Sequence, residues 1–103
     1  MSSFSNFGKS VDLLAPGEYV QSTIPSGKEG WMSGTSMASP ISAGVMGLIV
    51  SRNPFQKDVW KLKQIMIGGC LHNWVRGMRP YTSNLLVNTR DSSICRVNKF
   101  IYQ

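Results

Sequence analysis

Ser36 stands where this sequence could support nucleophilic chemistry. It follows a glycine-marked turn, Gly34-Thr35, and precedes a run of small and apolar residues that predicts a helix. Backbone N–H groups are unpaired at the start of a helix, and the helix dipole favours negative charge there. A hydroxyl at this place can attack a carbonyl, and the N–H of Ser36 could stabilise the resulting oxyanion. The alternative is that Ser36 only caps the helix, as serine frequently does.

The residues around this serine resemble the nucleophile motif of the subtilisin-like serine proteases (subtilases, peptidase S8). Segments 3–8, 11–17 and 21–25 also resemble the stretches that precede this motif in the family. The resemblance implies that Ser36 is the nucleophile and that Met32 and Ser33 border the substrate cleft. The motif itself is Gly34-Thr35-Ser36-Met37-Ala38-Ser39-Pro40, in which Gly34, Thr35, Met37, Ala38 and Pro40 support the nucleophile.

The other members of a catalytic triad are not found in this sequence. The family orders its triad as aspartate, histidine and serine, so both partners would precede Ser36, and neither of their motifs occurs. His72 is the only histidine, and we interpret it as a solvated loop residue. Asp12 is interpreted as structural, and Asn6 does not match the oxyanion asparagine of the family. We therefore expect the isolated chain to be inactive.

A helix over residues 36–52 must position Ser36. Pro40 is expected in its first turn, where the missing N–H costs little. The helix is apolar on nearly all sides, which predicts that it is buried. Gly44 and Gly47 would permit close approach of a neighbouring backbone. Before this helix, residues 11–14 and 18–24 are predicted as strands, 26–30 as a polar turn, and 31–33 as a short extended approach to Gly34.

The second half of the chain has weaker signals. Apolar residues recur at helical spacing over 55–67, and Gly68-Gly69 predicts the end of that helix. Residues 70–82 are expected to form a loop held by Leu71 and Trp74. Residues 85–88 are a candidate for either a strand or the entry to a helix, and 91–98 are a candidate helix. Tyr19, Trp60 and Trp74 are expected to be core or half-buried aromatics.

The resemblance implies an α/β fold, namely the C-terminal part of a three-layer domain with a mostly parallel sheet. At 103 residues the chain is too short for a whole subtilase catalytic domain, so the domain is expected to be incomplete. The resemblance is close over 2–54 and weaker over 55–70. We accordingly divide the chain into residues 1–70, the C-terminal portion of the catalytic domain, and residues 71–103, a divergent tail weakly similar to the domain's end.

Composition excludes several classes of function. The net charge is +6, but the basic residues are scattered and no binding motif accompanies them, so no nucleic-acid partner is expected. A hydrophobic content of 42% argues against disorder. The longest apolar run, 38–50, is too short and broken to span a membrane. No secretory signal follows Met1, and although the family is often secreted, the localisation stays open.

Cysteines and cofactors leave alternatives open. Cys70 and Cys95 could form one disulfide or be two core thiols, and their spacing matches no metal or redox motif. No cofactor or metal site is visible, and the sequence does not locate the calcium that the intact family can hold. The chain is thus expected to be a piece of a serine endopeptidase that acts on peptides or proteins. The alternative is a truncated or decayed non-catalytic copy that serves as an interaction protein.

Overall fold

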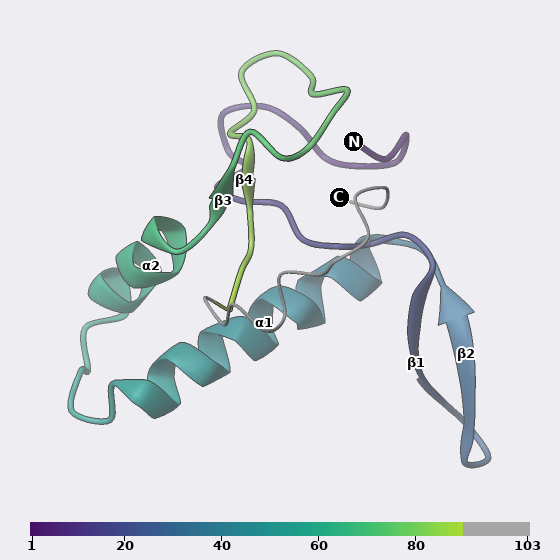
Figure 1. Ribbon diagram of the computed structural model, residues 1–103, viewed down its shortest axis with the longest axis horizontal. Helices are drawn as coiled ribbons and strands as arrows, with labels where there is room; N and C mark the ends of the chain where they lie inside the picture. The colour runs from purple at the N-terminus through teal and green to yellow at the C-terminus, as the bar shows by residue number, and fades with distance from the viewer. Residues whose placement is uncertain (90–103) are drawn as a thin grey trace.

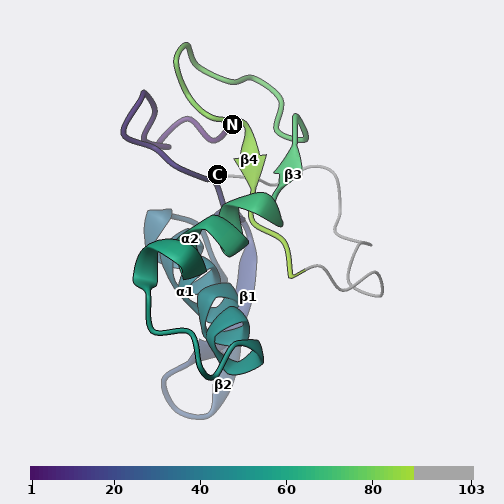
Figure 2. The ribbon, with the colours of Figure 1, turned by 90° about the vertical axis from the view of Figure 1, so that its left-hand side faces the viewer.

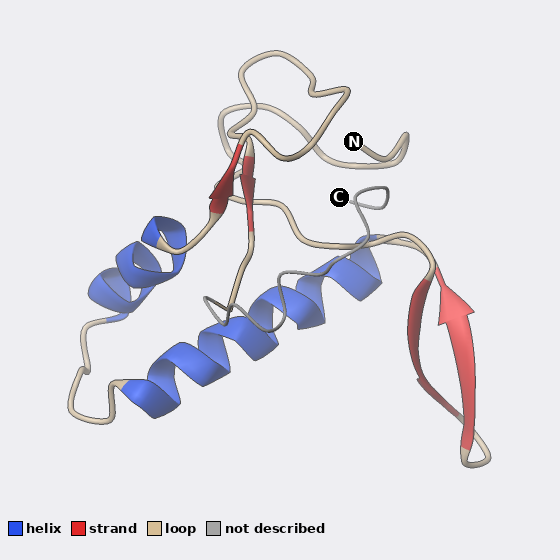
Figure 3. Cartoon of the chain, viewed as in Figure 1, coloured by secondary structure: helices blue, strands red, loops and turns tan. Residues whose placement is uncertain are grey.

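The computed structural model describes residues 1–89, which form two helices and two small pairs of strands (Figure 1). Loops connect these elements, and a long irregular segment precedes the first strand (Figure 3). In chain order the elements are β1 (Val20–Ile24), β2 (Lys28–Met32), α1 (Thr35–Arg52), α2 (Val59–Gly68), β3 (Leu71–His72) and β4 (Leu85–Leu86).

Helix α1 begins at Thr35, and Gly34 is its N-cap residue. The Gly34 carbonyl accepts hydrogen bonds from the N–H groups of Met37 (3.0 Å) and Ala38 (3.4 Å). Pro40 consequently lies inside the helix, in its second turn, and the prediction that it lies in the first turn was wrong. Since proline has no N–H, the Ser36 carbonyl four residues earlier lacks its usual helical donor.

The expectation that α1 is buried is also wrong for this chain, because Val45 is its only buried residue. One face of the helix packs against the core, whereas Leu48 and Val50 are exposed. Among residues 1–89, a side chain at Gly44 or Gly47 would meet nothing within 4 Å, so no backbone in this part of the chain approaches these glycines. The described residues supply a covering layer on one side of α1 only.

Strands β1 and β2 form an antiparallel hairpin that stands beside the start of α1 (Figure 1). Its register pairs Val20 with Met32 and Ile24 with Lys28. The predicted polar turn over 26–30 was therefore too long, because Lys28 already belongs to β2. The reversal occurs at Ser26 and Gly27, both at positive φ (69° and 68°). An exposed hairpin does not need an apolar face, so alternation could not reveal β2.

The core consists of two small apolar clusters rather than one continuous centre. One contains Leu14, Val75 and Leu86, and joins the first loop to β4 and the β3–β4 connection. The other is built from Ala15 of the first loop, Val45 of α1, Met66 of α2 and Val87 after β4. Among residues 1–89 no side chain is less than 2% exposed, so neither cluster is deep.

The described residues do not form the predicted mostly parallel sheet. Both strand pairs, β1–β2 and β3–β4, are antiparallel. The predicted strand 11–14 is reduced to a single parallel bridge between Leu14 and Leu86. Leu14 donates its N–H to Leu85 (2.7 Å), and its carbonyl accepts from Val87 (2.8 Å). Both helices lie between the bridged positions, as parallel pairing requires.

Helix α2 is shorter than the predicted 55–67, because Asp58 caps it immediately before Val59. It ends at Gly68, with Gly69 as the C-cap residue, as predicted. Residues 85–86 form a strand, which is one of the two alternatives for 85–88. The candidate helix 91–98 and Cys95 lie outside the described residues.

Two of the aromatic predictions were wrong, because Tyr19 and Trp60 are exposed. Trp74 is half-exposed, and Val75 is the buried anchor of its loop. Cys70 is a free, buried thiol that donates to the Met66 carbonyl (3.4 Å). Burial raises the pKa of this thiol and so favours its neutral, unreactive form.

Candidate active site

Gly34 sets the direction in which the chain enters α1. Its backbone angles, φ 153° and ψ 165°, lie in a region that side-chain-bearing residues rarely adopt. The Gly34 N–H donates to the Gly17 carbonyl at 2.7 Å, which ties the helix start to the loop after buried Ala15. Glycine at this position therefore allows a sharp entry, and the Gly17 bond fixes its place.

Ser36 is the second residue of α1, and it is exposed. The alternative in which Ser36 is the helix cap does not hold, because Gly34 occupies the N-cap position. Within residues 1–89, the N–H groups of Met37 and Ala38 are bonded to Gly34, and those of Thr35 and Ser36 have no acceptor. A hydroxyl oxygen and two unpaired backbone donors thus lie together at the positive end of α1.

A cleft of about 440 Å³ lies between the β1–β2 hairpin and the first turns of α1. We call it the hairpin cleft. Its size suits a few residues of an extended peptide or a small ligand. Its walls are mainly apolar, with polar side chains from β1. Its lining residues are Val20, Gln21, Ser22, Thr23, Ile24, Gly30, Met32, Ser36, Met37, Pro40 and Ile41.

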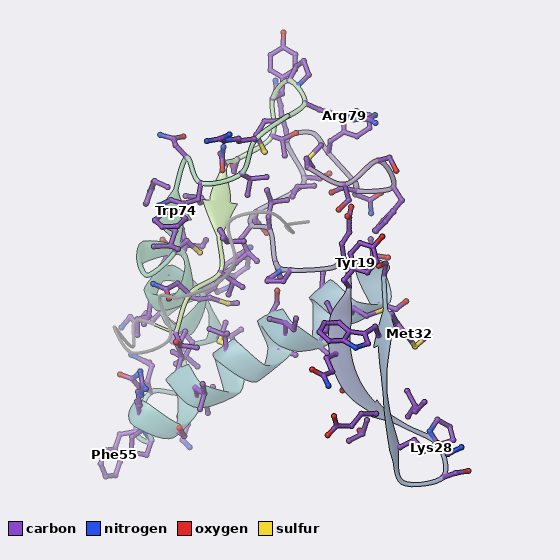
Figure 4. The ribbon with its side chains drawn as sticks, turned by 45° about the vertical axis from the view of Figure 1, so that its right-hand side comes forward. Tyr19, Lys28, Met32, Phe55, Trp74 and Arg79 are labelled. Atoms are coloured by element: carbon purple, nitrogen blue, oxygen red, sulfur yellow. The ribbon has the colours of Figure 1, made fainter. Side chains whose placement is uncertain are left out.

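The two residues expected to border the substrate cleft have different surroundings. Met32 lines the hairpin cleft with Ser36, and its exposed side chain lies at the end of β2 (Figure 4). The Ser33 hydroxyl instead accepts a hydrogen bond from the Tyr19 N–H at 2.9 Å. This bond continues the β1–β2 ladder by one step beyond the Val20–Met32 pair. Ser33 therefore holds the base of the hairpin closed.

A smaller cleft of about 230 Å³ lies on the other side of the same helical turns. Thr35 and Ala38 line it, together with Asn6 and apolar residues of the first loop. Residues of the motif 34–40 therefore line two different clefts, on opposite sides of the first turns of α1. Ser36, Met37 and Pro40 face the hairpin cleft, whereas Thr35 and Ala38 face the smaller one.

The charged residues singled out from the sequence lie on other elements. Asp12 forms an ion pair with Lys63 of α2 at 2.8 Å, in agreement with a structural role. His72 is exposed on β3, where it pairs with Leu85 of β4. Strand β3 and the start of α1 are separated in both orthogonal views (Figures 1 and 2).

Residues 1–89 hold no group of three or more His, Cys, Asp or Glu side chains able to bind a metal ion. Within the same residues, neither helix combines the length and apolarity needed to cross a membrane.

Comparison with known proteins defines the class. Residues 1–92 match the profile of the subtilase family, Peptidase_S8, and the chain belongs to this family. The match extends well past residue 70, although the resemblance in individual motifs is already weaker over residues 55–70.

Individual relatives are similar over about half of the chain. Subtilisin-like protease 12 of Arthroderma gypseum is 56% identical over 48 residues, which are 47% of this chain and 12% of that protein. Subtilisin of Bacillus pumilus is 50% identical over 52 residues, 50% of this chain and 19% of that protein. The intracellular serine protease of Paenibacillus polymyxa is 48% identical over 60 residues, 56% of this chain and 18% of that protein. The chain thus aligns with under one fifth of each of these relatives.

Several residues that shape this site were not found from the sequence. The segments that enter and leave the hairpin are joined by two hydrogen bonds. The Gly17 carbonyl accepts from the Gly34 N–H, and the Tyr19 N–H donates to the Ser33 hydroxyl. The Pro16-Gly17 pair gave a turn signal, but its backbone contact with Gly34 has no sequence signature. The hairpin cleft itself depends on β2, of which the sequence indicated only the end, at Trp31 and Met32.

Proposed function

We propose that this chain forms the nucleophile-bearing part of a serine peptidase that cleaves peptide bonds in protein or peptide substrates. The observation that supports this most strongly is the place of Ser36: exposed, second in α1, and at the wall of the hairpin cleft. Membership of the subtilase family agrees with it.

In the proposed mechanism, Ser36 Oγ attacks the carbonyl carbon of the scissile peptide bond. A histidine base takes the hydroxyl proton as the tetrahedral intermediate forms, and it delivers this proton to the leaving amine as the intermediate collapses to an acyl-enzyme. Water then hydrolyses the acyl-enzyme with the same histidine as base. The N–H of Ser36 donates to the oxyanion, and the positive end of α1 adds to this stabilisation. Met32 contacts the substrate beside Ser36. The base and the aspartate that orients it are supplied by residues other than these 103.

The test is peptidase activity of the complete polypeptide that contains this chain. Ser36→Ala should lower kcat by several orders of magnitude, because no other group can form the acyl-enzyme. Ser39→Ala is the matched control, since it removes a hydroxyl from the same motif but from the opposite wall of α1, in the smaller cleft. Equal activities of the Ser36 variant and the parent would overturn the proposal.

The alternative proposal is a non-catalytic subtilase copy that acts through its surface. It is favoured by one observation: the only histidine, His72, lies on β3 and not at the start of α1. A coding sequence with a His-Gly-Thr segment upstream of Ser36 would exclude this alternative. A complete polypeptide without such a segment, and without peptidase activity, would favour it.

A further inference from the structure

The loop between α1 and α2, together with the first residues of α2, exposes large apolar side chains at one end of the described structure. We call residues 53–61 the aromatic tip. Phe55 is 95% exposed, and Val59 and Trp60 are 71% exposed each. Figure 4 shows Phe55 at the outer end of this loop, far from Met32 and the hairpin. Apolar side chains gathered at this exposure indicate a surface that a partner covers.

The polar side chains of the tip bind the backbone of the tip and of the end of α1. Asn53 Nδ2 donates to the Ile49 carbonyl at 2.8 Å, and Gln56 Oε1 accepts from the Asp58 N–H at 3.0 Å. Asp58 Oδ1 accepts from the Trp60 N–H at 2.9 Å, as the cap of α2. The loop is therefore ordered by local hydrogen bonds that leave Phe55 and Trp60 turned outward. Presenting them to a partner requires no further folding of this loop.

Cationic side chains surround the aromatic tip. Over residues 52–63 there are four of them, and Asp58, whose carboxylate is engaged at the start of α2, is the one acidic residue. Lys63 is committed, because it pairs with Asp12 at 2.8 Å and lies 5.5 Å from the centroid of the Trp60 ring. Lys57 and Lys61 are exposed beside the aromatics. The tip thus combines an apolar centre with a basic margin.

We propose that the aromatic tip binds the surface of anionic phospholipid membranes. Tryptophan and phenylalanine enter the boundary between headgroups and acyl chains, and lysines are attracted to anionic headgroups. The tip projects from one end of the chain, a shape that fits a flat surface, whereas an acidic peptide is usually held in a groove or at a strand edge. The hairpin cleft is at the other end of α1, so it stays open to solvent.

Vesicle flotation of the complete polypeptide that contains this chain tests the proposal. The vesicles are phosphatidylcholine alone or mixed with phosphatidylserine, over a series of salt concentrations. The parent should bind the mixed vesicles only. The double variant Phe55→Ser with Trp60→Ser should bind at least about tenfold more weakly, because it removes the inserted rings.

Two further variants make the result specific. Tyr19→Ser with Trp31→Ser removes rings that are 66% and 64% exposed at the hairpin end, and it should bind as the parent does. Lys57→Gln with Lys61→Gln should weaken binding about thirtyfold and reduce its salt dependence, and it leaves the rings and the Asp58 cap unchanged. If the aromatic variant fails to fold, the lysine variant alone still tests whether the aromatic tip binds anionic vesicles.

Three results would overturn the proposal. The first is failure of the parent to bind the phosphatidylserine vesicles. The second is equal loss of binding in the tip and hairpin variants, which would indicate non-specific adhesion of exposed rings. The third is binding to soluble polyglutamate as tight as that to vesicles, with the same dependence on Lys57 and Lys61, which would indicate an acidic protein partner.

Discussion

Ser36 owes its exposure to the residue two places before it. The unusual φ of Gly34 turns the chain sharply into α1, and the bond from its N–H to Gly17 holds that turn in place. Ser36 therefore emerges in the first turn of the helix, beside unpaired N–H groups, rather than in a loop. In physical terms, the position of the hydroxyl depends on a backbone conformation that favours glycine.

Substitution of Gly34 tests whether its backbone conformation positions Ser36. Gly34→Ala should lower stability by about 1–3 kcal/mol, because of φ alone. A Cβ there would be 3.7 Å from Met37 Sδ and 3.8 Å from the Ser36 nitrogen, which are ordinary contacts. Peptidase activity of the complete polypeptide should fall further than the loss of stability explains. Gly77→Ala is the control: its φ is also positive, at 66°, but it lies in another loop. If both variants lose activity in proportion to stability, Gly34 does not position Ser36.

At the scale of elements, the two helices differ in how they are stabilised. Helix α1 has no side-chain cap at its N-terminus, and one side of it lies against the core. Helix α2 has Asp58 as its cap, and it buries Leu62 and Met66. The contact of Met66 with Val45 and Ala15 joins α2 to the part of the core that supports α1. Destabilisation of α2 should therefore also lower the stability of α1.

The cap of α2 can be tested directly. Asp58→Ala removes the acceptor of the Trp60 and Lys61 N–H groups, and it should destabilise the helix by about 1 kcal/mol. Hydrogen exchange of the amides in α2 should then be roughly fivefold faster. Asp58→Asn keeps an acceptor and should exchange nearly as the parent does. Unchanged exchange in the alanine variant would mean that tertiary contacts, not the cap, hold α2.

The sequence predicted α1 to within one residue, because Gly34 and the Asn53-Pro54 pair mark its ends and an apolar run lies between them. It predicted Ser36 at the start of that helix for the same reason. It predicted only the extended end of β2, at Trp31 and Met32. The start of β2 was missed, since Lys28 and Glu29 pair through their backbones and are exposed. The burial of α1 was overestimated. Its apolar sequence indicates that burial would be favourable, but it does not show that other residues of this chain pack against every side of the helix.

In the molecule as a whole, the described residues bury few apolar side chains and leave many large ones exposed. Nine apolar residues form the buried set, against twelve large hydrophobic side chains that are exposed. Such a surface favours association with other apolar surfaces. Membership of the subtilase family, together with alignment to less than one fifth of the relatives described, supports the proposal that other residues of a complete enzyme cover the part of this surface that lies outside the aromatic tip.

The isolated chain of 103 residues should therefore self-associate and show no peptidase activity. In subtilisin, removal of the triad histidine alone lowers kcat about 10⁶-fold, a known property of that enzyme and not a value from this structure. Light scattering after size-exclusion chromatography and a casein assay measure the two expectations. A monomer with a cooperative thermal transition would contradict the first. Hydrolysis that is abolished by Ser36→Ala would contradict the second.

The most direct measurement of the central claim is the site at which an organophosphonate inhibitor modifies the complete polypeptide. Such inhibitors react with a serine only when a base and an oxyanion site activate it. Peptide mass spectrometry should find the adduct on Ser36, with Ser33 and Ser39 unmodified, and prior heat denaturation should abolish it. Modification of a different serine, or no modification of a natively folded and complete polypeptide, would contradict the assignment of Ser36 as the nucleophile.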